Sequence, residues 1–115
     1  MPDLDKLAKK VIAFRDARDW AQFHNPKDVA ISLSLEASEL LEHFQWKDPG
    51  ETARHAKAGK AEISEELADV LYWVLLLGHD LGIKLDQALS KKLLKNAKKY
   101  PISKAKGRHT KYNKL

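Results

Sequence analysis

Four carboxylates stand out by their spacing within two apolar segments of the 115-residue sequence. Glu36 and Glu39 are three residues apart, and Glu66 and Asp69 repeat that interval further along the chain. Residues three apart share one face of a helix, so each pair is expected to present two carboxylates on the same side. Facing helices that each carry such a pair can hold a hard divalent cation through oxygen ligands.

The phase of each pair relative to the apolar stripe indicates that these acids point toward a core. The apolar residues within about 60° of Glu36 or Glu66 on a helical projection are Val29, Leu33, Leu40, Ile63, Val70 and Leu77. A carboxylate inside an apolar stripe is unfavourable unless it is paired or binds a metal. An all-oxygen site favours magnesium, with manganese as the alternative, over zinc, copper or haem iron. Ion pairs in a purely structural oligomer remain the competing explanation.

Helices are expected to position these acids, because apolar residues recur at three- and four-residue intervals. Asp3 is suited to cap the first helix, Pro26 to begin the second and Gly82 to end the third, while Asp86 is a candidate cap for the fourth. The expected helices span about 3–19, 26–45, 61–81 and 87–99, with a mobile polar loop at 48–60 and an irregular basic tail at 101–115. The sequence therefore predicts one all-α domain over residues 1–115, a four-helix bundle.

The run Val70–Leu77 makes its helix apolar on every side, so neighbouring elements must pack against more than one side of it. Three other short helices barely suffice within a monomer. We therefore expect a homodimer or a higher assembly, with this helix or its neighbour in the interface.

Charge is distributed unevenly along the sequence. Residues 1–90 hold 11 Lys/Arg and 16 Asp/Glu, whereas residues 91–115 hold 10 Lys/Arg and no acid. A basic segment after an acidic body suits a polyanion such as a nucleotide phosphate or a nucleic acid. The alternative is a solvated tail that keeps the protein soluble.

The absence of cysteine excludes disulfides, thiolate metal sites and a cysteine nucleophile. The longest apolar run is too short to span a bilayer, and the N-terminal residues resemble no secretory signal. A cytoplasmic protein with no membrane association is the expectation. The histidines His43, His55, His79 and His109 have no metal-ligand spacing and are interpreted as structural or surface residues.

Several segments together resemble the all-α nucleoside triphosphate pyrophosphohydrolases, in particular the MazG-like branch and its single-domain dCTP pyrophosphatase subgroup. The acid pairs match the E-x-x-E…E-x-x-D signature of that family. The other matching segments are Arg18-Asp-Trp20, Phe23-His24-Asn-Pro26, Phe44-Gln-Trp46, Lys98-Lys-Tyr100-Pro101 and Lys111-Tyr112. The resemblance covers nearly the whole chain.

This resemblance implies an oligomeric helical bundle, a homodimer or homotetramer, that cleaves a nucleoside triphosphate, dCTP or a related deoxynucleotide, between its α and β phosphates. It implies Mg²⁺, with Mn²⁺ as an alternative, held by the catalytic residues Glu36, Glu39, Glu66 and Asp69. The implied base-binding residues are Trp20, His24, Trp46 and Trp73, the last at a position where the subgroup often has tyrosine. Asn96 and Tyr100 match the segment that approaches sugar and phosphates, and Lys95 and Lys99, four residues apart on one helix face, are the first choices for phosphate contacts.

A binding module is the competing function: a small helical protein whose basic tail docks on nucleic acid. Its acidic body and the absence of a recognition-helix motif argue against this alternative, and nucleic acid is not the expected partner. The enzyme remains the leading hypothesis, with Glu39 as the candidate base.

Overall fold

The computed structural model describes residues 3–115, so the first two residues of the expected domain lie outside the described part. The chain divides into two compact units, Met1–Gly82 and Ile83–Leu115. Helices account for all the regular secondary structure between residues 3 and 115, which confirms the all-α class. Over the same residues, no helix combines the length and hydropathy that crossing a membrane requires.

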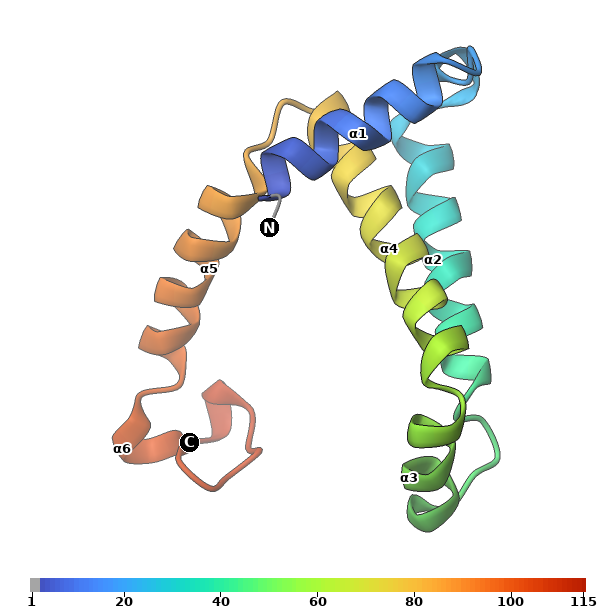
Figure 1. Cartoon of the computed structure of the whole chain (residues 1–115). Coiled ribbons are helices and arrows are strands. Elements are labelled where there is room, and N and C mark those ends of the chain that lie inside the picture. The colour runs from blue at the N-terminus through green and yellow to red at the C-terminus, as the bar shows by residue number, and fades with distance from the viewer. Residues whose placement is uncertain (1–2) are drawn as a thin grey trace. The chain divides into compact units, whose positions relative to one another are not determined.

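Two long antiparallel helices form the centre of the first unit. Its elements are α1 (Leu4–Asp16), the 3₁₀ turn η1 (Ala21–Phe23), α2 (Pro26–Glu42), α3 (Pro49–Ala58) and α4 (Lys60–Asp80). Figure 1 shows α2 and α4 side by side, with α1 crossing one end of α4 and α3 at the other end. Val29 from α2 and Leu75 and Leu76 from α4 are the fully buried apolar residues. The α2–α4 contact therefore sets the position of the acids.

The caps of the first two helices follow from side-chain chemistry. The Asp3 carboxylate accepts a hydrogen bond from the Lys6 N–H at 2.9 Å, and the Asn25 side chain accepts one from the Asp28 N–H at the same distance. Pro26 stands in the first turn of α2, where its missing N–H loses no hydrogen bond. After α4, Gly82 adopts a φ of 68°, the left-handed conformation common beyond a helix end. The expected roles of Asp3, Pro26 and Gly82 are confirmed.

Residues 48–60 were expected to form a loop, and this expectation is wrong. Ten of them form α3, whose N-terminus is capped by the Asp48 carboxylate accepting from the Glu51 N–H at 2.8 Å. Pro49 fits the first turn, and the small residues that suggested a loop are also compatible with a helix. Gly59 ends α3 and at once begins α4, so no loop separates the two helices.

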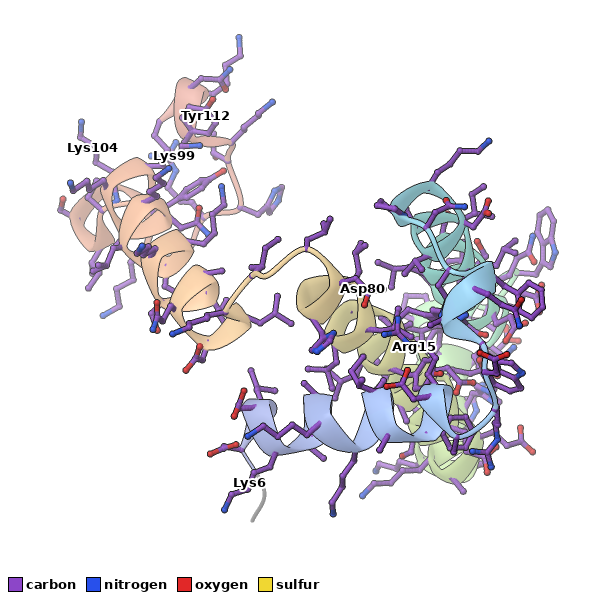
Figure 2. All side chains as sticks on the ribbon, turned by 90° about the horizontal axis from the view of Figure 1, so that it is seen from above. Lys6, Arg15, Asp80, Lys99, Lys104 and Tyr112 are labelled. Atoms are coloured by element: carbon purple, nitrogen blue, oxygen red, sulfur yellow. The ribbon has the colours of Figure 1, made fainter. Side chains whose placement is uncertain are left out.

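The second unit contains α5 (Leu85–Lys99), α6 (Ile102–Ala105) and the 3₁₀ turn η2 (Tyr112–Lys114). The expectation that Asp86 caps the helix before residue 87 is wrong, because α5 already begins at Leu85 and Asp86 accepts only from the adjacent Gln87 N–H. Tyr112 packs edge-on against Tyr100, and the Lys99 ammonium lies 4.8 Å from the Tyr112 ring centre (Figure 2). With α3 and α6, the described residues form six α-helices rather than four.

A part-buried ion pair ties α1 to the end of α4. Arg15 is 6% exposed, and its Nη1 donates to both carboxylate oxygens of Asp80 at 2.9 and 2.7 Å (Figure 2). Burial opposes ionisation of Asp80, but the hydrogen bonds from Arg15 and His79 outweigh it and hold the Asp80 pKa below its ordinary value. The charge of Arg15 is thus neutralised where α1 crosses α4.

Candidate functional site

Three carboxylates meet where α2 packs against α4. One oxygen from each of Glu36, Glu39 and Glu66 lies within 4.8 Å of the others. Glu36 and Glu66 are half-buried, and each has an enclosed Oε2 with no hydrogen-bond partner, whereas Glu39 is exposed. Enclosed acceptors without donors are rare in folded proteins, and a missing cation is one physical reason for them.

The proximity of these acids changes their protonation. Burial, followed by hydrogen bonding with Glu39 and the negative charges of the neighbouring carboxylates, raises the pKa of Glu36. Hydrogen bonding with Glu39 is the largest cause that raises the pKa of Glu66, followed by burial and like charge. Carboxylates that repel one another in this way are stabilised by a bound divalent cation, and oxygen donors suit Mg²⁺. The residues therefore fit a magnesium or manganese ion.

Asp69, the fourth expected ligand, is exposed and lies outside this group of three. Its charge nevertheless contributes to the raised pKa of both Glu36 and Glu66, so it lies within electrostatic range of them. Among residues 3–115, none of the four acids forms an intramolecular salt bridge with Lys, Arg or His. Ion pairs within the described chain therefore do not explain the acids.

An open cavity of about 410 Å³ lies directly beside the carboxylates. Its lining residues are Glu39, Glu42, His43, Lys47, His55 and Glu66. His43, at the end of α2, and His55, on α3, approach each other with Nδ1 and Nε2 3.0 Å apart and their rings stacked. The cavity thus joins the acids of α2 and α4 to one lysine and a histidine pair.

Aromatic side chains gather further along α4. The rings of His24 and Trp73 pack edge-on with centroids 5.4 Å apart, and Tyr72 packs edge-on against Trp73 at 5.0 Å. Two polar atoms in this region, His24 Nδ1 and Tyr72 Oη, are enclosed and have no partner within the described chain. Burial raises the pKa of Tyr72, which keeps its hydroxyl protonated. The structure therefore brings two of the predicted base-binding residues, His24 and Trp73, together.

The other two tryptophans lie apart from this pair. Trp20 is 41% exposed and packs edge-on against Phe14, whose ring also lies under the Arg18 guanidinium at 3.7 Å. Trp46 is 92% exposed and has a φ of 67°, a left-handed conformation that is unusual for a bulky residue. Strained backbone conformations of this kind cluster at functional sites, so Trp46 stays a candidate for one.

The remaining predicted substrate residues belong to the second unit. Lys95, Asn96 and Lys99 lie on α5, and Tyr100 is the residue at its C-terminal end. Within that unit Asn96 is half-buried and Lys95 is exposed. Their proposed roles rest on the sequence alone.

The sequence interpretation missed His43, Lys47 and His55. His43 follows Glu39 by four residues and Glu36 by seven, so it shares their helix face, and projecting the histidines as well as the acids would have revealed it. His55 carried no such signal, because its position depends on α3, where a loop was expected. The two histidines are interpreted from the sequence as structural or surface residues, whereas the structure places both in the cavity wall.

Comparisons with known proteins converge on one group. The model of the MazG-like family matches residues 31–115. The chain is 36% identical to dCTP pyrophosphatase 1 of Mus musculus over 117 aligned residues and 34% identical to that of Homo sapiens over 116, covering 99% of this chain and 68% of each relative. A crystal structure of a pyrophosphatase from Archaeoglobus fulgidus superposes with a TM-score of 0.82 at 38% identity, covering 88% of this chain and 94% of that one.

Proposed function

The chain belongs to the MazG-like family, and on that premise we propose that it hydrolyses dCTP or a related deoxynucleoside triphosphate to the monophosphate and pyrophosphate. It is an enzyme of the nucleoside triphosphate pyrophosphatase class. The observation that carries the proposal is the convergence of Glu36, Glu39 and Glu66, two of which have an enclosed oxygen without a donor. Both units are proposed to belong to one catalytic domain, and the cytoplasmic location stays a prediction.

Glu36, Glu39 and Glu66 are the proposed ligands of Mg²⁺, with Asp69 completing the set. When bound, Mg²⁺ neutralises phosphate charge and makes an attacking water more acidic. Glu39, exposed on the cavity side, is the proposed base that accepts the water proton, and in this role it acts as a base rather than as a ligand throughout. The water oxygen bonds to the phosphorus of the α phosphate. The bond from that phosphorus to the oxygen bridging the α and β phosphates breaks, so the nucleoside monophosphate forms and pyrophosphate leaves.

The base of the nucleotide is proposed to bind at His24 and Trp73. The His24 and Trp73 rings pack edge-on against each other and together offer an aromatic surface for a base. Trp20 and Trp46 remain candidates for stacking. Lys95, Asn96, Lys99 and Tyr100 are the proposed contacts to sugar and phosphates from α5.

Assembly as a homodimer or homotetramer is part of the proposal. Ile31 and Leu35 on α2 are 47% and 61% exposed, and Leu67 and Leu71 on α4 are 52% and 41% exposed. Each pair is one helical turn apart, so each helix carries an apolar stripe that a second copy would cover. Light scattering at several concentrations tests this, and a monomer throughout would refute it.

The function is tested by incubating the full chain with Mg²⁺ and a panel of deoxy- and ribonucleoside triphosphates. Separation of the products by ion-exchange chromatography distinguishes monophosphate plus pyrophosphate from diphosphate plus phosphate. The proposal expects the former, with dCTP or another deoxynucleotide turned over fastest. The absence of turnover of every nucleotide with Mg²⁺ and Mn²⁺ would refute it, and salt-sensitive DNA binding would then favour the basic tail as a nucleic-acid contact.

A further inference from the structure

Besides the carboxylates Glu39, Glu42 and Glu66, the cavity is lined by three side chains that are cationic or donate hydrogen bonds, called here its wall: His43, Lys47 and His55. We propose that this wall binds the two terminal phosphates of the substrate, the group that leaves as pyrophosphate. The inference rests on the proposed pyrophosphatase function and adds the residues that recognise the leaving group.

Three different parts of the first unit supply this wall. His43 lies one helical turn beyond Glu39 on α2, and Lys47 follows the left-handed residue Trp46 in the turn after α2. His55 projects from α3, where its ring lies so close to Gly59 that a Cβ there would meet its Cε1 at 2.8 Å. The His55 ring is therefore held against α2 by the short connection to α4.

The histidine pair keeps one hydrogen-bond donor besides the bond between its two rings. One ring nitrogen of His43 and one of His55 face each other at 3.0 Å, a hydrogen-bond distance. Whichever ring donates in this bond, the ring that accepts carries its own proton on its other nitrogen. That N–H, together with the ammonium of Lys47, suits phosphate oxygens, since charge-assisted hydrogen bonds to phosphate are among the stronger polar contacts.

The direction of the substrate follows from the antiparallel arrangement of α2 and α4. His43 lies beyond Glu39 on one side of the acids. Trp73, paired with His24, lies seven residues beyond Glu66 on the other side, about 10 Å along the helix. A nucleoside triphosphate carries its base at one end and its terminal phosphate at the other. With the base at Trp73 and the α phosphate at the acids, the terminal phosphates reach the wall formed by His43, Lys47 and His55.

The test compares binding of the two products. Lys47→Met and His55→Gln each remove one contact, and Lys57→Met is the matched control, because Lys57 lies exposed on α3 outside the cavity lining. Inorganic pyrophosphate and the nucleoside monophosphate are titrated separately into each full-length variant with Mg²⁺ by calorimetry, and both are measured as product inhibitors of turnover. Thermal melts verify folding.

We expect Lys47→Met and His55→Gln to weaken pyrophosphate binding about tenfold or more, the loss of one charge-assisted hydrogen bond. Monophosphate binding stays at the wild-type level, and Lys57→Met changes neither. Gly59→Ala, which displaces the His55 ring without removing it, also weakens the binding of pyrophosphate and not that of the monophosphate. This variant keeps the test valid if His55→Gln unfolds.

Unchanged pyrophosphate binding in the folded variants, or an equal loss of pyrophosphate and monophosphate, would overturn the inference. Failure of the proposed function is distinguished by the wild type. Absence of nucleotide turnover there refutes the reaction, while selective loss of pyrophosphate binding in the variants still supports the phosphate-binding wall.

Discussion

Two carboxylates of α4 in the Met1–Gly82 unit lie in different surroundings: Asp80 at the C-terminal end of the helix and Glu66 near its start. Asp80 faces the buried Arg15, and both of its oxygens accept hydrogen bonds from that guanidinium. Glu66 faces Glu36 and Glu39, and its enclosed oxygen has no donor. The same helix thus carries a charge that the chain itself neutralises and a charge that it leaves for a ligand.

This contrast separates a structural from a functional arrangement on physical grounds. Asp80 has a lowered pKa because hydrogen bonds from Arg15 and His79 outweigh the effect of burial. Glu36 and Glu66 have raised pKa values because burial and neighbouring acids both oppose ionisation. The pKa shifts of the two sets of carboxylates are opposite in direction. A lowered pKa marks a carboxylate neutralised within the chain, and raised pKa values mark a candidate binding site.

The largest effect is expected from Glu36→Gln. The substitution keeps the shape of the side chain but removes a charged ligand, so kcat/KM should fall by about a hundredfold to a thousandfold. Thermal stabilisation by Mg²⁺ should disappear in parallel. Glu65→Gln, an exposed neighbour on α4, is the control and should retain both properties. Retained activity in Glu36→Gln would contradict the metal-binding role.

Asp80→Asn is expected to have the opposite profile. Arg15 would keep its buried charge with only Asp16, whose Oδ1 lies 3.5 Å from its Nε, as a charged partner, so the free energy of unfolding should fall by about 1–3 kcal/mol. Urea denaturation measures this loss, while the activity of the remaining folded protein stays near wild type. The double variant Arg15→Met/Asp80→Leu should lose less than Asp80→Asn, since no buried charge remains, and a larger loss would refute this account of the pair.

In metal-free protein, the pH dependence of the free energy of unfolding distinguishes Asp80 from Glu36 and Glu66. Glu36 and Glu66 hold protons more tightly when folded, so their contribution to stability is fully present below the ordinary value of 4.5 and is lost as the pH rises through their raised pKa. Asp80 contributes above its ordinary value of 3.8 and loses that contribution as the pH falls. Urea denaturation across pH should therefore show maximal stability in mild acid. The loss of stability at low pH should be smaller in Asp80→Asn than in the wild type. An unchanged pH profile of the free energy of unfolding in this variant would contradict the role of Asp80.

Trp46→Gly is expected to have the smallest effect on stability. Glycine adopts the left-handed conformation at residue 46 without strain, so the free energy of unfolding should rise by at most about 1 kcal/mol. If the exposed indole contacts the nucleotide or a second copy, KM or the dimer dissociation constant should rise at the same time. A variant that is more stable and equally active in both assays would exclude a functional contact for Trp46.

The sequence predicted the parts of this site that depend on local periodicity. The i, i+3 spacing of the acids and their phase relative to Val29 and Val70 anticipated the half-buried positions of Glu36 and Glu66, because both helices are long and regular, whereas Glu39 and Asp69 are exposed. Contacts between distant segments carried no such signal. Arg15 and Asp80 are separated by 65 residues, and no periodicity links them.

The expected polar loop shows a different limit. Asp48 followed by Pro49 is a helix-start pattern, but Gly50 and the run ending in Gly59 favoured a loop. Missing α3 meant missing His55, and with it the histidine pair. An error in one short helix therefore removed His55, one of the three wall residues, from the prediction.

Gly59 has a consequence for how this chain can change through evolution. It ends α3 and begins α4 with no residue between them, so one inserted residue would turn α3 by about 100° relative to α4. That rotation would carry His55 away from His43, whereas a longer insertion elsewhere on the surface would leave the pair intact. The length of this connection therefore fixes where the His55 ring lies relative to His43.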